Sequence, residues 1–179
     1  VWANEEYEFI LAVTKNIVKV MERSPSAFSK MEEETLRDHM LVQLNGHYEG
    51  HATGETFNAA GKTDILVRWQ DKNVFIAECK IWRGPQSLKD ALDQLLSYTS
   101  WRDTKTALII FSRNKNHSTV LEKIKESVPV HSAYKRTRSE NLEEGEFRYV
   151  FGQPDDQNRE LFLAVQVFHV PSRELDQLA

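Results

Sequence analysis

The sequence predicts an α/β fold in which a mixed central β-sheet is flanked by helices. Apolar residues recur at helical spacing in four segments, and five other segments carry the alternating or continuous apolar runs of strands. The two kinds of segment interleave along the chain, as crossover connections between strands require. With 179 residues and 40% hydrophobic content, the chain is long enough for one domain with a core and short for two.

The first two elements are predicted to be amphipathic helices. Residues 4–22 form the first, because apolar side chains return every three or four positions. SPSAFS at 24–29 interrupts this pattern, and a second helix is expected over about 30–45, where Asn45-Gly46 is a good stop. The apolar stripe of the first helix contains Phe9, Val13, Ile17 and Val20, and it is widened by Tyr7, Ile10 and Leu11.

The middle of the chain predicts a hairpin, a helix and a buried strand. Strands at about 64–69 and 74–81 flank the polar turn QDKN, and a helix is expected over 86–99. The continuous apolar run TALIIFS at 106–112 suits a central strand that is covered on both faces.

The last third predicts a helix and a terminal hairpin. The helix is expected over 117–128, with Ser118 or Thr119 as its N-cap. Two apolar segments, 147–151 and 161–170, are separated by the turn-forming stretch GQPDDQNRE, which indicates a hairpin.

All of these elements are assigned to a single domain spanning 1–179. Its core is expected at about 31–128, with the helix at 4–22 and the hairpin at 147–170 as additions. The sequence does not begin with Met, so we expect a domain cut from a longer chain.

Composition argues against several classes of protein. The single cysteine, Cys79, permits no internal disulfide, and the six histidines lack the pairing typical of a zinc site. No apolar run is long enough to cross a bilayer, and the N-terminal stretch lacks the features of a signal peptide. A cytoplasmic location is therefore expected.

Charge is unevenly distributed although the net charge is only -4. Residues 101–138 contain nine Lys and Arg against three acids, whereas residues 139–179 contain three Arg against nine acids. A basic segment is what a polyanionic partner needs, and an uneven solvated surface is the alternative. The candidate contacts with a DNA backbone, which a solvated turn would equally explain, are Lys135, Arg136 and Arg138.

Three charged residues interrupt strands that otherwise suit a core. Asp64 opens the first strand of the predicted central hairpin, and Glu78 and Lys80 lie in the second. Alternation puts Glu78 and Lys80 on one face, roughly 7 Å apart along the strand. Across the hairpin, all three groups can converge. The alternative is a turn cap at Asp64 and a solvated edge strand, although Val74 and Ile76 share the face of Glu78.

Two converging carboxylates beside an ammonium group suit a hard divalent cation and a phosphate. Mg²⁺ prefers oxygen ligands and commonly combines one or two carboxylates with phosphate oxygens and water. A nearby ammonium stabilises charge that develops on a phosphate. Such a site activates water for attack at phosphorus.

These residues resemble the PD-(D/E)XK nuclease superfamily, which includes restriction endonucleases and Holliday-junction resolvases. The resemblance rests on Thr63-Asp64 and on the hydrophobic strand that contains Glu78-Cys79-Lys80, with Thr63 in place of the proline of the name. It covers about residues 31–112. It implies a restriction-endonuclease-like fold in which Asp64 and Glu78 bind Mg²⁺, with Mn²⁺ able to substitute, and Lys80 assists attack on phosphate.

The resemblance also implies three further site positions. A glutamate on the preceding helix is expected to point at the metal, and Glu33 is preferred over Glu34 because it heads the apolar stripe of that helix. Acids at a helix start also favour the macrodipole, which is the alternative. Gln94 on the following helix is expected to face the site. The backbone carbonyl of Cys79 is a candidate metal ligand, with its side chain in the core.

Residues next to the motif are candidates for nucleic-acid contacts. Arg83 is a candidate for a phosphate and Trp82 for stacking on a base, with a solvated Arg and a core Trp as alternatives. The polar loop before Asp64 adds candidate substrate contacts at His47, His51, Thr53 and Thr56.

The expected function is hydrolysis of phosphodiester bonds, in DNA, by a Mg²⁺-dependent nuclease. The alternative is a non-catalytic module of the same fold that binds nucleic acid or protein within a larger protein. A homodimer is an open expectation, because two strands must be cut, and the apolar tail strands are its candidate surface.

Overall fold

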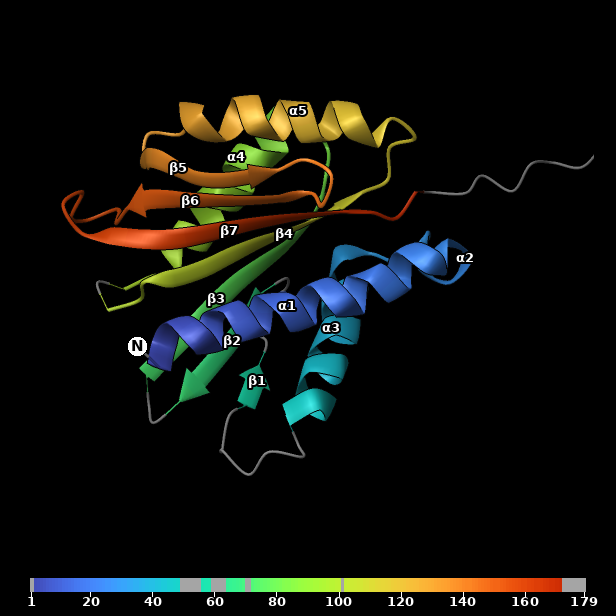
Figure 1. Ribbon diagram of the computed structural model, residues 1–179, viewed down its shortest axis with the longest axis horizontal. Coiled ribbons are helices and arrows are strands. Elements are labelled where there is room, and N and C mark those ends of the chain that lie inside the picture. Colours follow the sequence, from blue (N-terminus) through green and yellow to red (C-terminus); the bar gives the residue numbers. More distant parts are fainter. Residues whose placement is uncertain (1, 49–55, 59–63, 70–71, 101, 172–179) are drawn as a thin grey trace, which may run out of the picture.

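The computed structural model describes residues 2–48, 56–58, 64–69, 72–100 and 102–171 (Figure 1). The helices are α1 (Trp2–Arg23), α2 (Pro25–Phe28), α3 (Glu33–Tyr48), α4 (Pro85–Ser97), α5 (His117–Ser127) and the 3₁₀ turn η1 (Val128–Val130). The strands are β1 (Thr56–Asn58), β2 (Asp64–Trp69), β3 (Lys72–Ile81), β4 (Lys105–Ser112), β5 (Tyr134–Asn141), β6 (Glu146–Gly152) and β7 (Glu160–His169).

Within the described residues the strands form one open, mixed sheet of seven in the order β1-β2-β3-β4-β7-β6-β5. The three central strands, β3, β4 and β7, run parallel to one another. The pairs toward both edges are antiparallel. The predicted α/β class with a mixed sheet and flanking helices is therefore confirmed.

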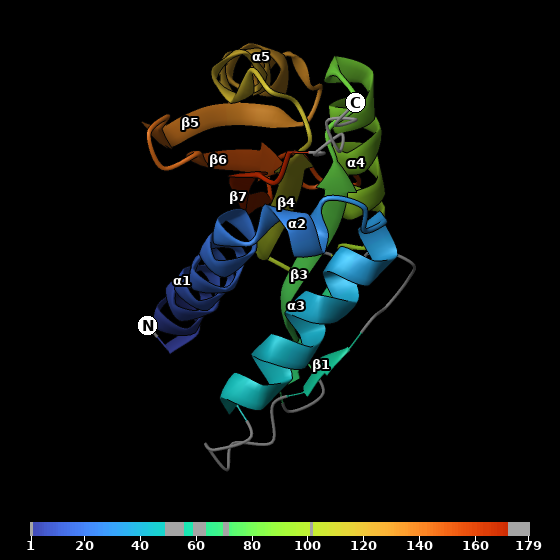
Figure 2. The same ribbon diagram turned by 90° about the vertical axis from the view of Figure 1, so that its right-hand side faces the viewer.

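Helices cover both faces of the sheet, and the sheet separates two layers of buried core residues (Figure 2). Helices α1 and α3 pack with one set of buried residues, and α4 and α5 pack with the other. Strand β3 shows the alternation that separates the layers, because Cys79 lies in the α1/α3 layer and Ile76 in the α4/α5 layer. Residues 106–112 of β4 are all buried, as expected for a central strand.

The predicted terminal hairpin is continuous with this sheet. Strand β7 pairs along its length with the central strand β4, and β6 pairs with β7. The large apolar side chains of this hairpin are buried within the chain, so they do not supply the exposed dimer surface that the sequence suggested. These side chains are Phe147, Tyr149, Phe151, Leu161, Leu163 and Val165.

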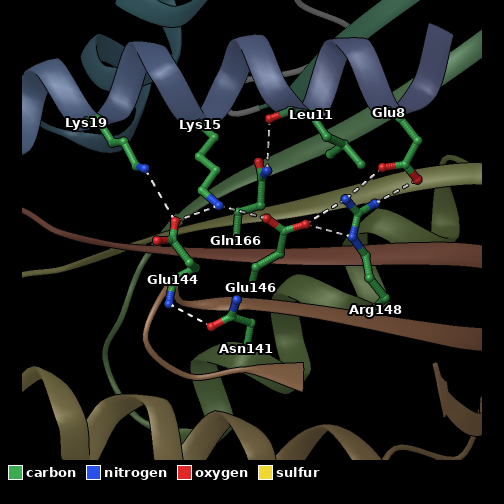
Figure 3. Close-up of polar contacts among 9 residues, drawn as sticks. All are labelled: Glu8, Leu11, Lys15, Lys19, Asn141, Glu144, Glu146, Arg148 and Gln166. Carbon is green, nitrogen blue, oxygen red and sulfur yellow. Dashed lines mark hydrogen bonds and ion pairs between the residues drawn. The ribbon is translucent and has the colours of Figure 1, made fainter. Parts of the chain in front are cut away.

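Polar contacts fix α1 across the C-terminal strands (Figure 3). Arg148 of β6 pairs with Glu8 of α1 at 3.0 Å, and Lys15 pairs with Glu144 at 2.7 Å. The buried side chain of Gln166 in β7 donates a hydrogen bond of 3.0 Å to the carbonyl of Leu11. Exposed ion pairs contribute about 1 kcal/mol or less each, so the apolar face of α1 supplies most of its attachment.

Helix α3 differs from its predicted bounds. It begins at Glu33 and runs through Asn45-Gly46 to Tyr48, so the predicted stop at Asn45-Gly46 was wrong. A glycine inside a helix costs about 1 kcal/mol. Burial of Leu36 and Leu44 on the sheet side outweighs that cost.

Three local features were not predicted. A short helix, α2, forms in SPSAFS with Pro25 in its first turn. The N-cap of α5 is Asn116, whose side chain accepts a hydrogen bond from the Thr119 amide, rather than Ser118 or Thr119. The YKRTR segment lies in edge strand β5, which carries mostly exposed polar side chains and so lacks an apolar alternation.

No helix in the described ranges is both long enough and apolar enough to span a bilayer.

Candidate active site

The β2–β3 hairpin brings the two predicted carboxylate positions opposite each other. Asp64 is the register partner of Glu78. Register partners in antiparallel strands have Cβ atoms about 4.5–5.5 Å apart on one face of the sheet. The side chain of Asp64 lies outside the described residues, so the backbone pairing is the observation that bears on this site.

Glu78 is fully buried on the face of β3 that α4 covers. Strand β3 lies between β2 and β4, where Glu78 pairs with Asp64 on one side and Leu108 on the other. The solvated edge-strand interpretation of Glu78 is therefore wrong. A carboxylate in such a position is costly to bury unless charge or hydrogen bonds compensate it.

Two residues beyond Glu78, Lys80 lines a cleft of about 570 Å³. The start of α3, the end of β3 and the C-terminal half of α4 contribute to its walls. Three residues that the sequence singled out from separate elements, Glu33, Lys80 and Gln94, all line it. Among the described residues, the lining consists of Glu32, Glu33, Glu34, Thr35, Lys80, Arg83 and Gln94.

Glu33 is the acidic residue that contacts strand β3. Its Oε1 accepts a hydrogen bond of 3.0 Å from the amide of Ile81. Its Oε2 lies 3.7 Å from Lys80 Nζ, and its Oε1 lies 3.7 Å from a guanidinium nitrogen of Arg83. Glu34 lines the same cleft but is exposed. Of the two glutamates that the sequence offered as pointing at a metal, Glu33 is the one that contacts the end of β3, and its metal-binding role stays a prediction.

The backbone explains why Glu33 reaches Ile81. The amide of Trp82 donates to the carbonyl of Phe111 in β4, at 2.9 Å. Adjacent amides of a strand point to opposite edges, so the Ile81 amide faces away from β4. It lies beyond Glu78, the last residue of β3 in the described pairing with β2. Backbone donors require partners, and the Glu33 carboxylate supplies one.

Gln94 and Arg83 both line the cleft, but their side chains differ in solvent exposure. Gln94 is half-buried, and its amide nitrogen lies 3.4 Å from the Tyr98 hydroxyl one turn along α4. Arg83 has 61% of its side chain exposed. Its backbone amide donates to Ser87 Oγ at 3.0 Å, in the first turn of α4. The guanidinium therefore stands at the mouth of the cleft.

Trp82 and Cys79 are core residues. Trp82 is 6% exposed and packs in the α4/α5 layer. The predicted base-stacking role of Trp82 is therefore wrong, because a buried indole offers no face to a base. The alternative, a core Trp, is correct. The Cys79 side chain is fully buried in the α1/α3 layer, as expected.

The three basic candidates Lys135, Arg136 and Arg138 lie on edge strand β5, away from the cleft at the end of β3. Strand β5 is four strand positions from β3, or roughly 19 Å at the usual strand spacing. Arg136 forms two hydrogen bonds with Glu160, at 2.6 and 2.8 Å, and Arg138 stacks over Phe162 at 4.8 Å. Lys135 is exposed beside them. The structure does not bring these three cations to the cleft.

The remaining candidates fall largely outside the described residues. His51 and Thr53 lie in such a segment, and for His47 and Thr56 only the backbone is described, in α3 and β1. Among described side chains, no group of three His, Cys, Asp or Glu is arranged to hold a metal ion. The Asp64 carboxylate is not part of that set.

Sequence reasoning missed two features of the cleft. Thr35 lines it, and its only sequence signal is its place one residue after Glu34. The contact between Glu33 and Arg83 joins positions far apart in the chain and depends on how α3 crosses the end of β3, for which the sequence carries no local signal.

Comparison with protein-family models, with curated proteins and with solved structures gives no match to this chain. The fold and the cleft therefore define an α/β protein with a mixed seven-stranded sheet and a charged cleft at the end of β3.

Proposed function

We propose that this chain is a Mg²⁺-dependent nuclease of the restriction-endonuclease-like fold, and that it hydrolyses phosphodiester bonds in DNA. The observation that carries the proposal is the register pairing of Asp64 with Glu78, two residues before a lysine that lines a charged cleft. That combination supports a site with two carboxylate positions and a cation at one end of the β2–β3 hairpin.

The donor set fits a hard divalent cation. The residues that would hold it are Asp64 and Glu78, with the backbone carbonyl of Cys79 as a third oxygen donor. The complete burial of Glu78 supports this assignment, because a bound cation offsets the cost of a buried carboxylate. When bound, Mg²⁺ supplies charge neutralisation and lowers the pKa of a coordinated water.

The other cleft residues act on the phosphate. Lys80 lines the cleft with 23% of its side chain exposed, and its ammonium group stabilises negative charge near the attacked phosphorus. Arg83 at the mouth of the cleft contacts a phosphate of the DNA backbone. Gln94 offers a neutral donor and acceptor on the α4 wall of the cleft.

The direct experiment is a cleavage assay with the purified chain and Mg²⁺ or Mn²⁺. Substrates are single-stranded, duplex and branched DNA, with RNA as a comparison. We expect cleavage of DNA, and we expect Lys80→Ala to reduce the rate by about 10²-fold or more. Lys123→Ala, which removes an exposed lysine of α5, is the matched control and is expected to retain the wild-type rate.

Two results would contradict the proposal. A wild-type chain that cleaves none of these substrates, yet binds DNA without a divalent cation, would indicate the non-catalytic binding module instead. A Lys80→Ala variant with the wild-type rate would remove the role assigned to the ammonium group.

A further inference from the structure

Glu33, one of the glutamates that line the cleft, contacts three donors in one short segment. Lys80, Ile81 and Arg83 lie within four residues at the end of β3, and each has a nitrogen within 3.0–3.7 Å of the Glu33 carboxylate. The Glu33 side chain is only 14% exposed, so these donors take the place of much of its hydration. Glu33 thus already has the partners that a buried carboxylate requires.

The three contacts differ in kind. The bond from the Ile81 amide, at 3.0 Å, is of ordinary hydrogen-bond length and ties the carboxylate to the backbone of β3. The distances to Lys80 and Arg83, both 3.7 Å, exceed those of charge-assisted hydrogen bonds, which are about 2.7–2.9 Å. The two cations are therefore drawn toward Glu33 electrostatically, and among the described residues this contact leaves N–H groups of both for another anion.

The position of Glu33 between two cations also controls where they point. Lys80 near the end of β3 and Arg83 just after it carry like charges, and they repel each other without an anion between them. Arg83 has the freedom to turn into solvent, since 61% of its side chain is exposed. An anchored carboxylate keeps both cations on the wall of the cleft.

We propose that Glu33 is a positioning residue rather than a ligand of the divalent cation: it is anchored by the Ile81 amide and holds Lys80 and Arg83 toward the phosphate of the substrate. This inference rests on the proposed nuclease function and revises the metal-binding role that the family resemblance implies for Glu33. It makes Arg83 the phosphate-binding residue that Glu33 orients.

The test compares Glu33→Gln with wild type in three measurements. Isothermal titration with Mn²⁺ reports metal affinity, fluorescence anisotropy with labelled DNA in Ca²⁺ reports substrate affinity, and steady-state cleavage in Mg²⁺ separates kcat from KM. Glutamine retains an oxygen that accepts from Ile81 but removes the charge that attracts the cations. Glu5→Gln makes the same change in the first turn of α1, remote from the cleft, and is the control.

We expect Glu33→Gln to keep its Mn²⁺ affinity within about twofold of wild type and to weaken DNA binding and raise KM by about tenfold, because the contacts described for Glu33 are with Lys80, Ile81 and Arg83. A loss of Mn²⁺ affinity by about tenfold or more would overturn the proposal, because Glu33 would then bind the ion or support one of its ligands. Unchanged DNA affinity and unchanged KM would also overturn it. A wild-type chain that binds both probes but cleaves nothing refutes the nuclease function, while the two binding measurements still decide the role of Glu33.

A second variant keeps the test informative if Glu33→Gln does not fold. Arg83→Gln changes an exposed side chain and is expected to retain Mn²⁺ affinity while weakening DNA binding by about tenfold. Wild-type DNA affinity in Arg83→Gln would contradict the inference, because Glu33 would then have no phosphate-binding cation to orient at the mouth of the cleft.

Discussion

Protonation of His117 is expected to destabilise the fold as the pH falls below neutrality. His117 opens helix α5, and its ring stacks on His169 at a centroid distance of 4.7 Å. The Nδ1 atom of His117 is buried and has no hydrogen-bond partner among the described residues. Burial, with a contribution from the neighbouring His169, lowers the pKa of His117 from 6.5 to about 4.

The sign of the effect follows from proton uptake. Between pH 6.5 and about 4 the unfolded chain carries a proton on His117 and the folded chain does not. Stability is therefore fully present above pH 6.5 and is lost progressively as the pH falls through this window. The full shift corresponds to a ceiling of roughly 3 kcal/mol, and because the ring is partly exposed, solvent screening reduces the expected loss to roughly 1–2 kcal/mol.

Other groups near His117 modify this response and must be held constant. Lys15, Lys19, Glu22 and Glu144 line the same cavity of about 180 Å³. The proximity of Lys15 and Lys19 lowers the pKa of Glu144, so that carboxylate remains ionised through most of the same pH window. The comparison of wild type with His117→Gln at each pH removes these shared contributions.

The assay is urea unfolding at pH 7.5 and at pH 4.5. We expect wild type to lose roughly 1–2 kcal/mol more unfolding free energy between the two pH values than His117→Gln does. Equal losses in the two proteins would refute the argument, because they would mean that His117 titrates alike in the folded and unfolded states.

Three other substitutions test separate parts of the structure. Gly145→Ala is expected to lower the free energy of unfolding in urea by about 2 kcal/mol or more. Gly145 has a φ of 63°, and an added Cβ would lie 2.5 Å from the Val167 carbonyl oxygen. An unchanged unfolding midpoint would contradict this turn geometry. Tyr7→Phe is expected to cost about 1–2 kcal/mol in the same assay, because its hydroxyl donates to the buried Thr106 carbonyl at 2.7 Å, and a neutral result would argue against that bond. Arg136→Ala is expected to change DNA affinity by less than about twofold, because its exposed pair with Glu160 lies at the far edge of the sheet; a tenfold loss in anisotropy would place the substrate there instead.

Elements with strong apolar periodicity were predictable from the sequence. The run at 106–112 indicated a strand covered on both faces, and β4 is that strand, with central pairing to β3 and β7. Strand β5 was not predictable in the same way, because an edge strand needs no apolar alternation and its side chains are mostly exposed. The end of α3 was misplaced because tertiary burial outweighs the local preference of Gly46.

The candidate site was also predictable only in part. The sequence puts Asp64 and Glu78 on neighbouring strands of a hairpin, and side-chain alternation puts Lys80 on the face of Glu78. Their exact pairing was not predictable, because it depends on β3 beginning at Lys72, inside the predicted turn, and on a bulge between Val67 and Arg68. The contact of Glu33 with Ile81 and Arg83 depends on where the first turn of α3 meets the end of β3. Such tertiary placement leaves no periodic signal in the sequence, which is why Arg83 was tied to a phosphate but not to Glu33.

The most direct test of the central claim is a crystal structure of the chain soaked in Mn²⁺, with the ion located by anomalous scattering. The account predicts an anomalous peak within about 2–2.5 Å of oxygens from both Asp64 and Glu78, at the inner end of the cleft that Lys80 lines. Carboxylates of Asp64 and Glu78 that point to opposite faces of the sheet, or an ion bound elsewhere, would contradict it.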